Sequence, residues 1–344
     1  MKTSNFFQHL TLFSVIWKSW FLGIFLVSFT LPLLAQDGGE TSGGEGQTTY
    51  PNLTPAGFLQ THFSADDVAD NPANFSIHRA RMGFTGNLSE NIKLNLIIGA
   101  TEPPDNSPAL VNAFADFTID PLFNLRAGQF FAPFGIEGPE PITRNPAIER
   151  AFSTRRMNPF RMFRDIGVMA YGEHSIFGYS VAIMNGRGAN VLEGSDSKDI
   201  VGRVDIAPVD KLVAGISAHL GTYETGAGRL ARQRWGLHAE YQQSPLLLRG
   251  EYFIRDREIV PDNRAQSTGG YLLAKYEISE EWEAIGRYDH FSPEGEGDPY
   301  QGLTLGPNYQ LGPNTQLSLN TILYTPVNDD AMHNLLNIQL QMVL

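Results

Sequence analysis

One segment of this sequence is rich in arginine, a residue type suited to binding anions. Between positions 144 and 164 the chain holds six arginines and a single acid, Glu149, although its formal net charge is −12. A guanidinium group offers five N–H donors in a planar fork that suits phosphate and carboxylate oxygens. Arginines along a pore lower the barrier for anions and exclude cations. The segment therefore predicts an anion-binding surface, made of Arg144, Arg150, Arg155, Arg156, Arg161 and Arg164.

Residues for catalysis or metal binding are scattered. Histidines occur singly, without HxxH-type spacing, and there is no GxSxG turn or phosphate-binding glycine loop. His290 is the one histidine beside an aspartate, Asp289, and we interpret this pair as structural rather than catalytic. The acidic segment 292–299 could hold Ca²⁺, but its oxygen spacing is incomplete, which favours a solvated turn. We therefore expect no enzyme activity, no cofactor and no metal, and the acidic charge argues against nucleic acid as a partner.

Sixteen short segments must position these side chains, and most of them alternate apolar and polar residues. In the last segment Leu336, Ile338 and Leu340 alternate with Asn337 and Gln339. Successive side chains on a strand point to opposite faces, so each such strand has one apolar face and one polar face. The predicted strands are 55–63, 75–87, 91–101, 110–119, 123–132, 164–174, 176–184, 198–207, 211–223, 232–243, 245–255, 267–278, 280–291, 300–311, 314–325 and 333–344.

The connections between these strands alternate between short turns and longer loops. This alternation is typical of a closed barrel across an outer membrane, where one rim carries tight turns and the other carries long loops. After the predicted signal sequence, no segment approaches about twenty uninterrupted apolar residues, so we expect no spanning helix. The longest connection is 133–163, which contains most of the arginine-rich segment, and such a length usually indicates function. The sequence thus predicts an all-β transmembrane antiparallel barrel of about sixteen strands, filling 53–344, with short turns on the periplasmic side.

The start of the chain resembles a secretory signal. Lys2 and Lys18 supply positive charge, an apolar run spans 20–34, and Ala35 is a small residue at the expected cut. We predict a signal peptide at 1–35. Residues 36–52 are rich in glycine and acids, which predicts a flexible periplasmic segment before the barrel.

Strand parity predicts a second set of arginines on the inward, polar face. A charge facing lipid at mid-membrane costs about 2–4 kcal/mol, so an inward position is favoured. The same parity turns several carboxylates inward, so each of these arginines could instead brace the barrel wall as half of an ion pair. The arginines predicted to line the lumen are Arg79, Arg81, Arg126, Arg203, Arg234, Arg249 and Arg287.

Five stretches, in order, resemble the phosphate-selective porin O/P family. LRAGQFFAPFGIEG at 125–138 is similar to its strand-then-loop signature, and Phe131 stands where members often carry a lysine. The resemblance implies a sixteen-stranded, usually trimeric channel with a preference for anions. In porins the loop after the fifth strand commonly folds inward and narrows the pore. The other stretches are FSIHRARMGFTGNL at 75–88, RDIGVMAYG at 164–172, YSVAIMNGRG at 179–188 and DIVGRVDIAP at 199–208.

The expected function is passive diffusion of small solutes through an outer-membrane porin, leaning to anions such as phosphate. The expected surroundings are outer-membrane lipid, lipopolysaccharide and two further copies of the chain in a homotrimer. A substrate-specific channel for acidic organic solutes is the first alternative, and a barrel enzyme or a structural barrel is the second. The loop arginines could also stay outside the lumen and bind lipopolysaccharide phosphates.

Overall fold

A computed structural model describes residues 49–68, 73–102, 107–192, 197–225, 228–260, 263–295, 297–329 and 331–344. The predicted signal peptide and residues 36–48 of the predicted flexible segment lie outside these residues, whereas Asn52 already belongs to the first strand. Among the described residues, no helix is long and apolar enough to cross a membrane.

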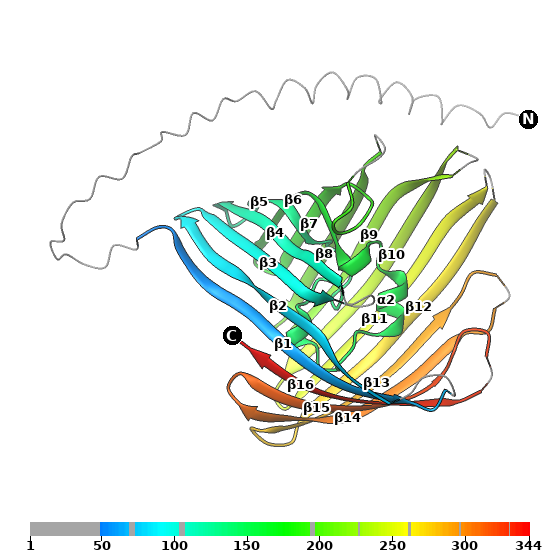
Figure 1. The fold of residues 1–344 in the computed structure, drawn as a ribbon. Helices are drawn as coiled ribbons and strands as arrows, with labels where there is room; N and C mark the ends of the chain where they lie inside the picture. The colour runs from blue at the N-terminus through cyan, green and yellow to red at the C-terminus, as the bar shows by residue number, and fades with distance from the viewer. Residues whose placement is uncertain are drawn as a thin grey trace, which may run out of the picture. The chain divides into compact units, whose positions relative to one another are not determined.

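Sixteen antiparallel strands form a closed barrel, in which each strand pairs with the next and β1 pairs with β16 (Figure 1). Closure leaves no unpaired sheet edge, which lipid would not tolerate. This confirms the predicted fold. The strands are β1 (Asn52–Asp66), β2 (Asn74–Ser89), β3 (Ile92–Glu102), β4 (Ser107–Asp120), β5 (Phe123–Phe131), β6 (Arg164–His174), β7 (Phe177–Met184), β8 (Asp199–Val209), β9 (Leu212–Thr225), β10 (Gly228–Gln243), β11 (Leu246–Val260), β12 (Asn263–Glu277), β13 (Trp282–Ser292), β14 (Tyr300–Gly312), β15 (Thr315–Thr325) and β16 (His333–Val343).

Two rims differ in their connections. We call the rim with the turns at 90–91, 121–122, 175–176 and 244–245 the turn rim, and the opposite rim, where β5 ends and β6 begins, the loop rim. The predicted strands 245–255 and 267–278 leave a loop between them at the loop rim, and that loop prediction is wrong. Residues 256–266 are mostly the paired ends of β11 and β12, for example Asp256 opposite Gln266. Alternation is lost there because successive residues, such as Asp256, Arg257 and Glu258, are all polar, yet the ladder of hydrogen bonds continues.

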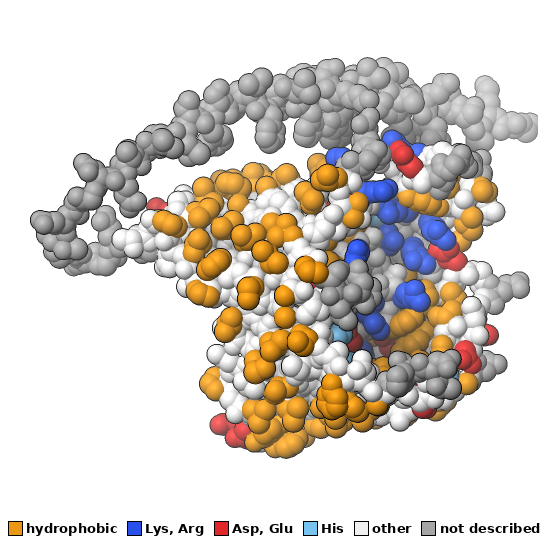
Figure 2. Space-filling view, viewed as in Figure 1, with side chains coloured by type: hydrophobic (Ala, Val, Ile, Leu, Met, Phe, Trp, Pro, Cys, Tyr) orange, Lys and Arg blue, Asp and Glu red, His pale blue; other side chains and the backbone are white. Residues whose placement is uncertain are grey.

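The two faces of the wall follow the predicted parity in β16. Asn337 and Gln339 point inward and are 3% and 4% exposed, whereas Met342 on the other face is 36% exposed. Large apolar side chains such as Phe75 and Leu272 are exposed on the outside, and Figure 2 shows an extensive hydrophobic surface over the strands. An apolar outer band of this kind is what lipid requires.

The long connection between β5 and β6 enters the barrel. It contains η1 (Ile142–Arg144), α2 (Phe152–Met157) and η2 (Arg161–Phe163), and α2 packs against β11, β12 and β13 (Figure 1). Phe134 and Met157 of the connection share an apolar cluster with wall residues Phe253 and Phe291. Burying a large apolar side chain contributes about 1.5–3 kcal/mol, so this cluster holds the connection against the wall.

Candidate pore constriction

Wall carboxylates fasten the connection by accepting hydrogen bonds from its backbone. Glu251 of β11 accepts from the N–H groups of Ile136 at 2.7 Å and Glu137 at 2.8 Å. The Tyr271 hydroxyl donates a third hydrogen bond to Glu251 at 2.8 Å. Backbone N–H groups withdrawn from water need acceptors, and the strand side chains supply them.

Two more strands hold the middle of the connection. Asp289 of β13 accepts from the N–H of Ser153 at 3.1 Å, and Asn320 of β15 accepts from the N–H of Ile148 at 2.9 Å. Asp289 also accepts from the N–H of Phe152. The lumenal acids Glu251 and Asp289 therefore bind the loop backbone and are less available to attract cations.

A cavity of about 550 Å³ lies between the connection and the loop rim. Seven arginines and two glutamates line it, a formal excess of five positive charges. Figure 2 shows Lys and Arg side chains gathered in a hollow of the molecule. We call this space the arginine cavity, and its charged lining is Arg79, Arg81, Arg150, Arg155, Arg156, Arg161, Arg164, Glu102 and Glu149.

Five of the six arginines in the predicted loop surface thus meet in one cavity, joined by two strand arginines. Arg144 does not join them. It is exposed and lines a different cavity, nearer the turn rim. The predicted set is therefore divided between the two sides of the connection, because η1 and α2 lie at different depths along the barrel.

The two glutamates each pair with a strand arginine. Arg81 holds Glu102 through Nε at 2.5 Å and Nη2 at 2.6 Å. Arg79 donates to Glu149 at 2.9 Å, and His78 also contacts this carboxylate. Burial raises the pKa of Glu149, but Arg79 and His78 outweigh it and hold that pKa well below its ordinary value.

A β-bulge brings His78 to the inner face. The register passes from Gln60 opposite Arg79 to Thr61 opposite Ile77, so His78 is the extra residue of the bulged strand. Regular alternation would have turned His78 toward lipid. No residue pattern in the sequence predicted this bulge.

Four other arginines of the cavity have no carboxylate within ion-pair distance among the residues that the structure describes, namely Arg150, Arg155, Arg156 and Arg164. Arg150 and Arg164 are only 6% and 3% exposed. Arg150 donates to the carbonyl of Glu137 at 2.9 Å, and Arg164 donates to the side-chain oxygen of Asn112 at 2.8 Å. Burial lowers the pKa of Arg150 to about 10, so it remains charged at neutral pH. Arg155 and Arg156 are exposed on α2 and are likewise without such a partner in the described ranges.

Aromatic rings back these guanidinium groups. The guanidinium carbon of Arg164 is 3.5 Å from the centre of the Phe131 ring, and that of Arg150 is 4.5 Å from the Phe163 ring. Arg156 lies 5.0 Å from the Phe152 ring. Cation–π contacts of this kind stabilise an arginine without neutralising its charge.

The backbone beside these rings is strained. Met162 and Phe163 have φ of 56° and 61°, in the left-handed region that non-glycine residues rarely adopt. Each such residue costs on the order of 1–3 kcal/mol, and strain of this kind clusters at functional sites. These two residues turn the chain from α2 into β6 and face the arginine cavity.

The strand arginines predicted to line the lumen are mostly halves of ion pairs. Arg126 holds Asp116 at 2.7 Å, Arg203 holds Asp205 at 2.8 Å, and Arg249 holds Glu140 at 2.6 Å. Pairing therefore cancels much of the charge that these arginines bring.

Two further lumenal arginines contact the loop or a histidine. Arg287 lies 3.6 Å from Glu137, and Arg234 donates to Nδ1 of His219 at 3.0 Å. Within the described residues, Arg234 has no carboxylate at ion-pair distance.

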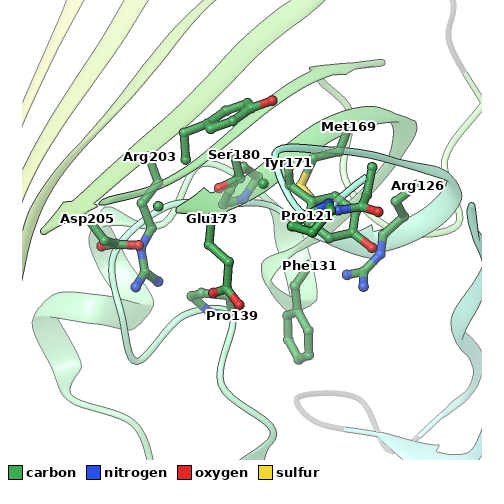
Figure 3. Close-up of a pocket in the computed structure, with 15 residues that line it drawn as sticks. Pro121, Arg126, Phe131, Pro139, Met169, Tyr171, Glu173, Ser180, Arg203 and Asp205 are labelled. Carbon is green, nitrogen blue, oxygen red and sulfur yellow. The ribbon is translucent and has the colours of Figure 1, made fainter. Parts of the chain in front are cut away.

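Cavities nearer the turn rim are balanced in charge. One, of about 510 Å³, is lined by Arg126 and Arg203 and by Glu173 and Asp205 (Figure 3). Figure 3 shows the two arginines on opposite sides of this cavity, with Phe131 between them. The other, of about 360 Å³, carries three basic and three acidic side chains, which are Arg144, Arg249, Lys275, Glu140, Glu240 and Glu283.

Three inward arginines near the loop rim were not among the predicted residues. In the register of β10 and β11, Arg232 lies opposite Arg257, and Arg234 lies opposite Arg255. Like charges directly opposite are destabilising, and acids offset the repulsion. Arg232 binds Asp199 at 2.7 Å, whereas Arg255 and Arg257 bind an acid of the next loop, Glu294, at 3.2 and 2.6 Å. Arg232 and Arg255 lie at the ends of the predicted strands 232–243 and 245–255, where parity already points them inward, and only Arg257 lies beyond a predicted strand.

A closed sixteen-stranded antiparallel barrel with an apolar outside and a charged lumen is the architecture of an outer-membrane porin. The family model described as phosphate-selective porin O and P matches residues 58–227 and 219–343. The chain belongs to this family, and its place is the bacterial outer membrane. No curated protein sequence matches it.

Solved porins share the fold at low sequence identity. The anion-selective porin from Comamonas acidovorans superposes with a TM-score of 0.68 at 13% identity, covering 85% of this chain and 99% of that one. A loop L8 deletion mutant of OmpT, an outer membrane protein of Vibrio cholerae, gives 0.65 at 10% identity, with coverage of 85% and 99%. Salmonella typhi OmpF in complex with daunomycin gives 0.64 at 10% identity, with coverage of 85% and 97%.

Proposed function

We propose that the chain is a channel through which small solutes diffuse passively, and that it favours anions, phosphate among them. The observation that carries this proposal is the lining of the arginine cavity, with seven arginines against two glutamates. Low-dielectric walls focus the field of such a cluster and raise the local concentration of counter-ions. A permeating anion exchanges hydration for guanidinium contacts, whereas a cation meets a barrier.

In this proposal the connection between β5 and β6 forms the constriction. Arg150, Arg155, Arg156, Arg161 and Arg164 act on the loop-rim side, and Arg144 acts on the turn-rim side. The paired arginines of the wall brace the barrel and contribute less to selectivity, because each brings its own carboxylate. Hydrogen bonds from the connection to β11, β13 and β15 support this role over an external one on lipopolysaccharide.

The test is the reversal potential of the protein in a planar bilayer under a KCl gradient. We expect the sign that indicates chloride selectivity. A potential of zero or of the cation-selective sign would overturn the proposal.

We also propose a homotrimer surrounded by lipid and lipopolysaccharide. One OmpT structure of similar fold is described as a trimer form, which supports this assembly. Detergent-resistant oligomers that dissociate on heating should appear on gels. A single monomer band without heating would contradict the trimer.

An enzymatic role finds little support in the one adjacent His–Asp pair. Asp289 faces the lumen and binds the loop backbone, whereas His290 lines an outer groove with Leu237 and Leu272. The two side chains point to opposite faces of β13, so they cannot act on one substrate. We therefore propose a channel without enzyme activity.

A further inference from the structure

The arginine cavity also has an apolar wall. Phe152, Phe160, Met162 and Phe163 line it beside the arginines. An inorganic oxyanion presents only polar oxygens and gains nothing from phenyl rings. Building on the proposed anion channel, we propose that this cavity selects organic carboxylates bearing an aromatic ring over inorganic oxyanions such as phosphate.

Two arginines of the cavity, Arg150 and Arg164, still have N–H groups that can donate to a carboxylate. Arg150 uses Nε and Nη2 for the carbonyls of Glu137 and Glu140, and Arg164 uses Nε and Nη1 for Asn112 and Met162. The remaining Nη1 of Arg150 and Nη2 of Arg164 make no hydrogen bond within the described ranges. A carboxylate can accept from such donors in the geometry that guanidinium favours.

Because these two arginines are buried, an incoming anion stabilises them more than it would stabilise exposed arginines. A buried charge without a partner is costly, and Arg150 and Arg164 are both less than a tenth exposed. Their neighbours Arg79 and Arg81 already hold Glu149 and Glu102. The unpaired guanidinium groups therefore define where the carboxylate would lie.

The apolar half is fixed before a ligand arrives. The Phe152 ring stacks on Tyr300 at 3.9 Å between centroids, and Phe160 meets His219 edge to face at 5.5 Å. Rings held by packing lose little freedom when a ligand binds, which favours affinity. An aromatic ligand could pack against them in offset or edge-to-face geometry.

The cavity is also larger than a tetrahedral oxyanion needs. Its volume of about 550 Å³ lies within the range of about 300–1,000 Å³ that is usual for organic ligands. A benzoate-like anion could place its carboxylate among the arginines and its ring against the phenyl wall at the same time.

The experiment is block of the chloride current through the full chain in planar bilayers, with benzoate, acetate and phosphate as probes. We expect benzoate to reach half-block at a concentration roughly tenfold below that of phosphate, because its ring buries apolar surface. Acetate, which has the carboxylate without the ring, should block no better than phosphate. Equal half-block by benzoate and acetate would overturn the proposal without any variant.

Two matched variants test where the ring of benzoate binds. Phe163→Leu removes the phenyl group above Arg150 and should raise the half-block concentration of benzoate about fivefold, with acetate unchanged. Phe114→Leu removes a ring 4.2 Å from Arg126, outside the arginine cavity, and should leave benzoate block unaltered. An equal loss in both variants would overturn the assignment to this cavity. Heat-modifiable migration on gels checks that both variants fold.

Failure of this inference is distinguishable from failure of the proposed function. A chloride-selective reversal potential together with phosphate block as strong as benzoate block would remove only the aromatic preference. A cation-selective reversal potential would remove the anion channel and this inference with it.

Discussion

The two sides of the inserted connection are lined by the same residue types but differ in balance. On the loop-rim side the arginine cavity has seven arginines and two glutamates. On the turn-rim side the two cavities have two basic against two acidic side chains, and three against three. We infer from this difference that selectivity in this lumen depends on which arginines lack carboxylates rather than on how many arginines there are.

Pairing also explains how an acidic chain can favour anions. Glu251 and Asp289 bind loop N–H groups, and Glu140 binds Arg249. The net charge of −12 is thus a poor guide to the field inside the lumen. What a permeating ion meets is the local excess of unpaired groups.

The largest expected effect is from Glu251→Ala, which would remove the boundary between the two sides. The N–H groups of Ile136 and Glu137 would lose their acceptor, at about 1–3 kcal/mol each. We expect the connection to detach, conductance to rise and selectivity to fall in planar bilayers. Glu283→Ala, which also removes one lumenal acid but touches no loop N–H in the described ranges, is the control. Similar conductance changes in both variants would show that Glu251 is no anchor.

The second prediction tests the comparison directly. Replacing both Arg155 and Arg156 by Ala should lower the anion-to-cation permeability ratio roughly fivefold or more, because each charge a few ångströms from an ion in water contributes about 0.5–1 kcal/mol. Arg144→Ala, on the balanced side, should change the ratio much less. Reversal potentials of the three proteins provide the measurement. If Arg144→Ala has the larger effect, the two sides are assigned in the wrong order.

The third prediction concerns the direction of current. A charge excess at one end of a lumen makes the current depend on the sign of the voltage, because counter-ions accumulate at that end for one polarity only. With the protein inserted in one orientation, single-channel currents at equal positive and negative voltages should differ at low salt. The difference should shrink in about 1 M salt, where the screening length falls to about 3 Å. Symmetric currents at low salt would argue against the charge asymmetry.

The smallest effect is expected at the loop rim. Hydrogen bonding by Arg257 lowers the pKa of Glu294 below its ordinary value of 4.5. The carboxylate therefore stays charged at neutral pH, and its contribution to stability is lost only as the pH falls through the lowered pKa. Glu294→Gln at neutral pH should raise the anion preference slightly, since Arg255 and Arg257 would lose their counter-charge. A shift of the reversal potential toward cations would contradict this role.

The fold could be predicted because strand alternation is a local property. Each residue of β16 is placed inward or outward by its neighbours in the chain, and the predicted limits of β6, 164–174, match the structure. The limits of β11 could not be predicted, since its end is polar on both faces and pairs only because β12 continues beside it. The bulge at His78 could not be predicted either, because it is a shift in the register between β1 and β2.

The barrel, the faces of its strands and the concentration of arginines after β5 follow from the amino-acid sequence alone. Which lumenal arginines have a carboxylate partner depends on the tertiary structure. Arg79 meets Glu149 and Arg249 meets Glu140 across 70 and 109 residues of chain, whereas Arg150 and Arg164 meet no carboxylate in the described ranges. Such partners are chosen by where the inserted connection lies inside the barrel, and hydrogen bonds to distant strands fix that position.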